Sequence, residues 1–178
     1  MMLPAHPGLI RFAFNWSGKA ELSQPPAGKQ NRQYYEAGRS MVSEKRPRIL
    51  VVDDDEELRE MICNFLTYRG CYVETACDGV DGCSALERST FDMVITDIYM
   101  PRMNGLELLD TIGQKYAHLL TLAMTGFPNA DVTTKVIEKG ACDCLVKPFH
   151  LNHLLTTITK CFEQSDSHRA LSKTLSDH

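Results

Sequence analysis

Short apolar runs alternate with helical patterns five times between residues 48 and 163, and this alternation strongly constrains the fold. The apolar runs are suited to strands buried on both faces, and they cover 48–52, 71–76, 93–96, 119–124 and 144–146. Helical spacing predicts helices over 58–69, 79–88, 105–116, 129–139 and 150–163, with Gly70 and Gly140 placed to end the first and fourth. We therefore predict an α/β fold, a flavodoxin-like doubly wound sheet of five parallel strands in the order 2-1-3-4-5, with five helices.

The segments on either side of this pattern have a different composition. Five of the eight prolines lie in the first 47 residues, among Gly, Ser, Gln and Asn, which predicts a disordered extension over 1–46. An alternative is that translation starts near Met41 and that the preceding residues are a wrongly assigned extension. We expect one folded domain over 47–163, followed by a polar tail at 164–178 that is too short for a second domain.

Charge and hydropathy exclude several function classes. The net charge of −4 divides into +4 for residues 1–47 and −8 for the remainder. An acidic domain is poorly suited to direct nucleic-acid binding, which needs cationic surface. No apolar stretch approaches the ~20 residues that span a bilayer, and Arg11 and Asn15 interrupt the apolar patch of the leader. We expect a cytoplasmic protein without membrane insertion.

The seven cysteines are odd in number and contain no CxxC pair. They predict reduced thiols rather than a disulfide framework or a zinc finger. Cys142 and Cys144, with His150 and His153, are an alternative metal or redox site. That set lacks recognised ligand spacing, so core packing of the two thiols is favoured.

Polar residues follow four of the predicted strands. Asp53, Asp54 and Asp55 follow the first strand, Asp97 the third, Thr125 the fourth and Lys147 the fifth. The carboxyl ends of parallel strands meet at one edge of a sheet, where ligands bind in such folds. Each residue alone has a simpler role: Asp54 or Asp55 as a helix cap, Thr125 in a turn, Lys147 as a solvated charge.

Together these side chains point to phosphoryl chemistry. Clustered carboxylates repel unless a cation joins them, and oxygen ligands favour Mg²⁺. A lysine and a threonine hydroxyl opposite them suit a group with anionic oxygens. Asp97 is the candidate nucleophile, since a carboxylate can form an aspartyl phosphate.

Four segments resemble the signature segments of the response-regulator receiver domain of two-component signalling: ILVVDDDEELREMI, DMVITDIYMPRMNGLELL, LAMTGF and VKPF. The resemblance covers residues 47–163 and is to the stand-alone, chemotaxis-regulator-like type. It implies that Asp97 accepts a phosphoryl group from a histidine kinase or a His-containing phosphotransfer protein. It also implies that Asp53, Asp54, Asp97 and the backbone carbonyl of Tyr99 hold Mg²⁺.

The resemblance assigns further roles. Lys147 would pair with the phosphoryl oxygens, Thr125 would hydrogen-bond them, and the bond before Pro148 is cis in the family. Partners would dock on the fourth helix, fifth strand and fifth helix. The chemistry would be limited to self-phosphorylation and self-dephosphorylation, so we do not expect an enzyme acting on an outside substrate.

Three positions depart from the family or vary within it. Cys144 replaces the usual aromatic residue three before the lysine, so switching is expected to depend more on the loop from Thr125 to Pro128. Tyr99 and Phe127 stand two residues beyond Asp97 and Thr125, at positions that border the path of the attacking water. We hypothesise that they slow hydrolysis; the alternative is that both are surface aromatics away from the site.

Three alternative functions are considered for this sequence. The chain could be an intermediate phosphoryl carrier in a phosphorelay. It could be a metal-dependent phosphohydrolase that forms an aspartyl phosphate, with Asp53 and Asp55 as nucleophile and acid/base. A flavin-binding protein is disfavoured, because acids follow the first strand where a phosphate loop is needed.

Overall fold

The computed structural model describes the backbone of residues 46–176 and the side chains of residues 46–167. The predictions for the N-terminal extension, both disorder and a start near Met41, concern residues that lie outside this range.

A single sheet of five parallel strands forms the centre of the fold, in the order β2-β1-β3-β4-β5. The strands are β1 Arg48–Val52, β2 Tyr72–Ala76, β3 Met93–Asp97, β4 Leu120–Thr125 and β5 Asp143–Val146. The predicted fold and strand order are confirmed. Residues of β3 are buried throughout, which explains why its sequence is apolar without alternation.

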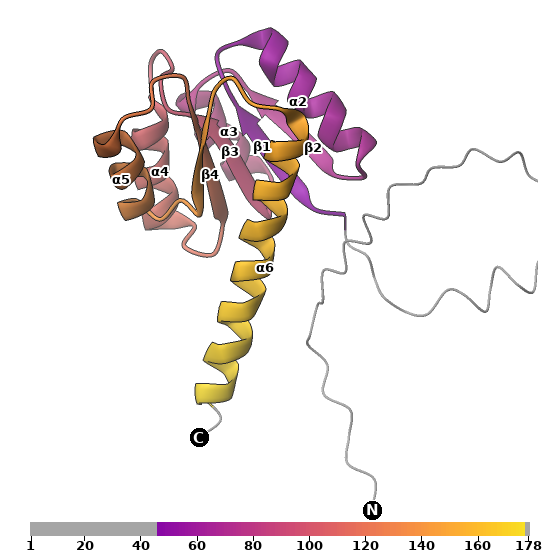
Figure 1. Cartoon of the computed structure of the whole chain (residues 1–178), viewed down its shortest axis with the longest axis vertical. Coiled ribbons are helices and arrows are strands. Elements are labelled where there is room, and N and C mark those ends of the chain that lie inside the picture. The colour runs from indigo at the N-terminus through magenta and orange to yellow at the C-terminus, as the bar shows by residue number, and fades with distance from the viewer. Residues whose placement is uncertain (1–45, 177–178) are drawn as a thin grey trace, which may run out of the picture. The chain divides into compact units, whose positions relative to one another are not determined.

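Five helices cover the two faces of the sheet: α2 Glu56–Tyr68, α3 Gly79–Arg88, α4 Gly105–Lys115, α5 Ala130–Glu138 and α6 Leu151–Ser176. Figure 1 shows α3, α4 and α5 grouped on one face, with α2 and α6 on the other. The predicted fourth and fifth helices are thus α5 and α6. Side chains of α3 and α4, such as Leu86, Leu108 and Ile112, pack on Leu50 and Val94 of the sheet.

The helix starts and ends follow local sequence signals. Four cap side chains, Asp55, Asp78, Asn104 and Asn129, accept hydrogen bonds from backbone N–H groups in the first turns of α2, α3, α4 and α5. Gly70 and Gly140 follow α2 and α5 with φ of 90° and 89°, a backbone conformation that glycine adopts without a steric penalty.

The last helix is longer than predicted. We expected an end at residue 163 and a polar tail, whereas α6 continues to Ser176. No glycine or proline occurs between 151 and 176, so the polar composition that suggested a tail contains no signal that would end a helix.

The prediction of seven reduced thiols is wrong for one pair. Cys142 and Cys161 form a disulfide, with their Cα atoms 5.8 Å apart and a sequence separation of 19. Cys142 precedes β5 and Cys161 is buried on α6, so packing of the helix on the sheet brings them together. This pairing removes Cys142 from the alternative metal site. The free thiols among the described residues are Cys63, Cys71, Cys77, Cys83 and Cys144.

None of the helices in the described part of the chain combines the length and the apolar character that a membrane span requires.

Candidate functional site

The predicted cluster of polar residues forms at the carboxyl edge of the sheet. Strands β1 and β3 are neighbours with Val52 opposite Thr96, so Asp53 and Asp97 follow side by side. Lys147 comes from the far side of β4, directly after β5, and its Nζ lies 2.8 Å from Asp53 Oδ2 and 2.8 Å from Asp97 Oδ2. One ammonium group therefore joins two carboxylates from two strands.

Asp97 is held in a fixed orientation. Its Oδ1 accepts hydrogen bonds from the backbone N–H groups of Ile98 at 2.6 Å and Tyr99 at 3.4 Å, while Oδ2 faces Lys147. The start of α4 lies directly against its backbone: a Cβ at Gly105 would collide with the Asp97 carbonyl oxygen and lie 2.8 Å from Ile98 Cα. The carboxylate thus has one oxygen bound by amides and one paired with a cation.

Asp53 is fully buried and fixed from three directions. Its Oδ1 accepts from the N–H of Asp55 at 3.0 Å, and its carbonyl oxygen accepts from Arg59 at 2.7 Å. Burial raises the pKa of Asp53 above its ordinary value, and the hydrogen bond and charge of Lys147 only partly offset this effect. A cation near this carboxylate is therefore favourable.

Lys147 keeps its charge at this site. Burial by itself lowers the pKa of the ammonium group, but the hydrogen bonds and charges of Asp53 and Asp97 outweigh burial and raise the pKa above its ordinary value. The lysine is thus a permanent positive charge beside Asp97 Oδ2 at physiological pH.

Three carboxylates form a candidate metal site. Oxygen atoms of Asp53, Asp54 and Asp97 all lie within 4.8 Å of one another. An all-oxygen set of this kind, with an exposed member in Asp54, fits a hard cation that keeps several waters, such as Mg²⁺. The adjacent Asp55 has a different role, because its side chain caps α2 by accepting from the N–H of Leu58.

Thr125 lies on the strand next to Asp97, and no hydrogen bond joins the two side chains. Asp97 is opposite Met124 in the sheet, one residue earlier, and Thr125 is fully buried. Its hydroxyl accepts from the N–H of Phe127 at 3.2 Å. The structure therefore places Thr125 at the predicted edge, bonded to the loop that follows it.

Tyr99, Phe127 and Cys144 are the three positions at which the sequence departs from the family pattern or holds a variable residue. Tyr99 is 47% exposed, and its ring packs edge to face on the ring of Phe127, a residue that is 72% exposed. Cys144 is half-buried and packs with Leu106 against the apolar cluster between the sheet and α5. The peptide bond between Lys147 and Pro148 is cis, as predicted.

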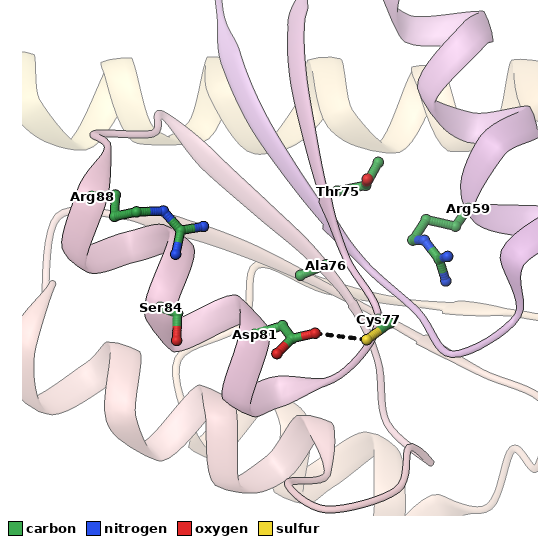
Figure 2. Close-up of a pocket in the computed structure, with 7 residues that line it drawn as sticks. All are labelled: Arg59, Thr75, Ala76, Cys77, Asp81, Ser84 and Arg88. Atoms are coloured by element: carbon green, nitrogen blue, oxygen red, sulfur yellow. Dashed lines mark hydrogen bonds between the residues drawn. The ribbon is translucent and has the colours of Figure 1, made fainter.

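An ion-pair cluster beside the site escaped sequence reasoning. Arg102, in the loop after β3, pairs with Asp78 and Asp81 at the start of α3. Asp78 directly precedes the helix predicted at 79–88 and Arg102 lies in the segment MPRMNG, but no local pattern in the sequence connects the two. An open cavity of about 400 Å³ borders this cluster, lined by Arg59, Thr75, Ala76, Cys77, Asp81, Ser84 and Arg88 (Figure 2).

Comparison with known proteins agrees with this geometry. The family model for the response regulator receiver domain matches residues 49–159. The chain is 36% identical over 114 residues to the response regulator protein FleR of Pseudomonas aeruginosa, a match that covers 64% of this chain and 24% of FleR. It is 36% identical over 111 residues to the response regulator MprA of Mycobacterium leprae, covering 62% of this chain and 49% of MprA. The chain thus spans half or less of these relatives.

Solved structures show the same likeness. The chemotaxis response regulator CheY4 of Vibrio cholerae is 30% identical with a TM-score of 0.62, over 65% of this chain and 98% of that one. A CheY-like receiver domain protein of Methanospirillum hungatei is 26% identical with a TM-score of 0.66, over 69% of this chain and 98% of that one. The chain belongs to the response regulator receiver domain family of two-component signalling.

Proposed function

We propose that this chain is a single-domain response regulator that accepts a phosphoryl group on Asp97 from a histidine kinase or a His-containing phosphotransfer protein. The observation that carries this proposal is the position of Lys147, whose Nζ lies 2.8 Å from both Asp53 and Asp97. An acid with one oxygen bound by amides and the other beside a partly buried lysine ammonium group is arranged for nucleophilic attack on an anionic phosphorus centre.

The transfer step follows from the orientation of Asp97. The Oδ2 atom attacks the phosphorus of phosphohistidine, a P–O bond forms, the P–N bond breaks, and the imidazole leaves with the electron pair. Lys147 pairs with the phosphoryl oxygens, and backbone N–H groups of Ile98 and Tyr99 continue to hold Oδ1. Asp53, Asp54, Asp97 and the carbonyl of Tyr99 would hold Mg²⁺, which neutralises charge on the transferring group when bound.

The conformational signal would begin at Thr125. Its hydroxyl is bonded to the N–H of Phe127, and exchange of that bond for one to the phosphoryl group would move the loop between β4 and α5. The proposed readout is the surface formed by α5, β5 and α6, which would contact a cytoplasmic protein partner rather than DNA or a membrane. Self-phosphorylation and self-dephosphorylation are the chemistry proposed, without turnover of an outside substrate.

A phosphorelay carrier remains the second proposal, because it would use the same Asp97 chemistry. The phosphohydrolase alternative is weaker, since the side chain of Asp55 is engaged as the cap of α2 and does not serve as an acid/base. Transfer of the phosphoryl group from this chain to a histidine on a phosphotransfer protein would distinguish the carrier.

Incubation with Mg²⁺ and acetyl phosphate tests the proposal directly. We expect a mass increase of one phosphoryl group that does not form when EDTA is present during the incubation, and does not form in Asp97→Asn. The matched control is Asp131→Asn, which changes an exposed aspartate in the first turn of α5. A modified Asp97→Asn protein, or no modification of the wild type by acetyl phosphate or by phosphorylated kinases, would contradict the proposal.

A further inference from the structure

The loop between β3 and α4 connects the nucleophile to the next helix and contains a strained residue. Arg102 has φ of 61°, the only positive φ at a non-glycine position among residues 46–176. The left-handed region is sterically disfavoured for a residue with a side chain, so other contacts must hold Arg102 there.

The guanidinium group of Arg102 provides those contacts. It donates to Asp78 through both Nε and a terminal nitrogen, and the same terminal nitrogen lies 3.2 Å from Asp81. The terminal nitrogen is also 3.7 Å from Cys77 Sγ. The Cys77 thiol donates to Asp81 at 2.7 Å. Figure 2 marks this bond between Cys77 and Asp81. The two-point contact is with one oxygen, Asp78 Oδ2, and the additional pair with Asp81 holds the guanidinium group between two carboxylates.

The ion pair between Arg102 and Asp78 matters for stability because Asp78 is buried. Only 2% of the residue is exposed, and its Oδ1 already accepts from the N–H groups of Val80 and Asp81 at the start of α3. A buried carboxylate without a cation is strongly destabilising, so the pair with Arg102 anchors the loop to a rigid helix end.

Backbone contacts extend the anchor to the next residue. The carbonyl of Met103 accepts from the N–H of Gly79 at 3.1 Å, and a Cβ at Gly79 would lie 2.7 Å from that carbonyl oxygen. At the other end, the N–H of Ile98 donates to Met124 O at 3.0 Å. Tyr99 therefore lies in a short segment fixed on both sides, with α3 providing one of the two attachments.

We infer that Arg102 is a positioning residue for the metal site: its ion pairs with Asp78 and Asp81 set the position of the Tyr99 backbone, and thereby the affinity for Mg²⁺. This inference rests on the proposed function, in which the Tyr99 carbonyl is a ligand. Arg102 acts through the loop and touches neither the metal nor the phosphoryl group.

A second metal site is the competing interpretation of this cluster. Ligand atoms of Cys77, Asp78 and Asp81 lie within 4.8 Å of one another. The Arg102 guanidinium already contacts all three side chains and supplies the positive charge that a metal ion would bring. The cluster is therefore a structural ion-pair network.

Calorimetric titration of the unphosphorylated full chain with Mg²⁺ provides the test. Arg102→Met removes the charge at similar length, and Arg102→Gly also removes the side chain but relieves the backbone strain. We expect the Kd for Mg²⁺ to rise about tenfold in both, the scale on which loss of a group supporting metal ligands acts. Arg102→Lys, which keeps the charge without the two-point contact, should recover part of the affinity.

A second readout separates positioning from loss of structure. In phosphorylation by acetyl phosphate, the Mg²⁺ concentration for half-maximal rate should rise about tenfold while the rate at saturating Mg²⁺ stays near that of the wild type. The double variant Asp78→Asn/Arg102→Met should raise the half-maximal Mg²⁺ concentration no more than either single change does, because both changes break the same ion pair between Asp78 and Arg102. Lys139→Met, which breaks the ion pair with Asp110 between α4 and α5, is the matched control and should leave the Kd unchanged.

The possible outcomes distinguish a failure of the inference about Arg102 from a failure of the proposed function. Wild-type Kd values in Arg102→Met and Arg102→Gly, with normal binding by the wild type, would overturn this inference alone. A lower rate at saturating Mg²⁺ with an unchanged half-maximal concentration would also overturn it. A wild type that neither binds Mg²⁺ nor becomes phosphorylated would overturn the proposed function and this inference with it.

Discussion

The ring of Phe127 meets the ring of Tyr99 edge to face, with centroids 5.6 Å apart and ring planes at 88°. Tyr99 follows Asp97 by two residues and Phe127 follows Thr125 by two, so the pair connects the loops after β3 and β4 beside the nucleophile. Aromatic pairs in this arrangement attract each other beyond the effect of burial, which favours a closed pair over two separate rings.

We predict that this pair slows hydrolysis of the phosphorylated protein by limiting the approach of water. Tyr99→Asn or Phe127→Ala should release phosphate about threefold to tenfold faster, a barrier change of up to ~1.4 kcal/mol. Phosphate release after removal of the donor measures the rate. Tyr68→Asn changes another exposed tyrosine, at the end of α2, and should match the wild type. Equal rates in all four proteins would show that the aromatic pair does not restrict water.

Gly105 lies against the backbone of Asp97, whereas Gly113, also in α4, has room for a Cβ. We therefore predict that glycine-to-alanine substitution has opposite effects on stability at these two positions. Gly105→Ala would force a Cβ against the Asp97 carbonyl oxygen and should destabilise the fold and impair phosphorylation. Gly113→Ala has its nearest neighbour, Lys139 O, at 3.9 Å and should stabilise the protein by about 0.5–1 kcal/mol. Urea unfolding measures both; a tolerated Gly105→Ala would show that α4 moves away from Asp97 easily.

The disulfide between Cys142 and Cys161 predicts a stability that responds to reductant. It closes a loop with a sequence separation of 19 residues, and opening such a loop should lower the free energy of unfolding by about 3 kcal/mol. The comparison is urea unfolding of the wild type with and without dithiothreitol. The double variant Cys142→Ala/Cys161→Ala should show no response to the reductant, and an unresponsive wild type would mean that the bond contributes nothing to stability.

A buried thiol predicts a loss of stability at alkaline pH. Burial raises the pKa of Cys71 from 9.0 to about 11. Between these values the unfolded chain releases the thiol proton and the folded chain retains it, so the stability present below pH 9 falls as pH rises toward 11. Between pH 8 and pH 10.5 the wild type should lose about 2 kcal/mol more than Cys71→Ala. Parallel pH profiles of unfolding for the two proteins would contradict this.

The sequence predicted those parts of the fold that are determined by local sequence patterns. Continuous apolar runs such as RILVV indicated strands buried on both faces, and Gly70 and Gly140 marked helix ends through their backbone freedom. The site was predictable for the same reason, because topology brings residues at strand ends such as Asp53 and Asp97 to one edge.

The features that the sequence did not predict are of two kinds. Some depend on contacts between side chains that are distant in sequence, and one depends on the absence of a residue that would end a helix. The bond between Cys142 and Cys161 and the pair of Asp78 with Arg102 arise from packing, which no spacing in the sequence records. The extent of α6 was missed because polar residues were interpreted as a tail, although a helix without glycine or proline has no local reason to stop.

The length of α6 gives this helix a mechanical property. Among the side chains described, those of residues up to 167, the buried apolar residues of α6 are Leu154, Ile158, Cys161 and Phe162, which lie in its first half. Figure 1 shows the second half of the helix running on past the sheet. At 1.5 Å per residue, the segment from 163 to 176 extends roughly 20 Å beyond the packed part. The first half of α6 acts as a pivot, bonded to the start of β5 through Cys161, and the half that runs past the sheet acts as a lever arm. A tilt of about 10° at the pivot, too small to disturb the core, moves the backbone at Ser176 by roughly 3 to 4 Å.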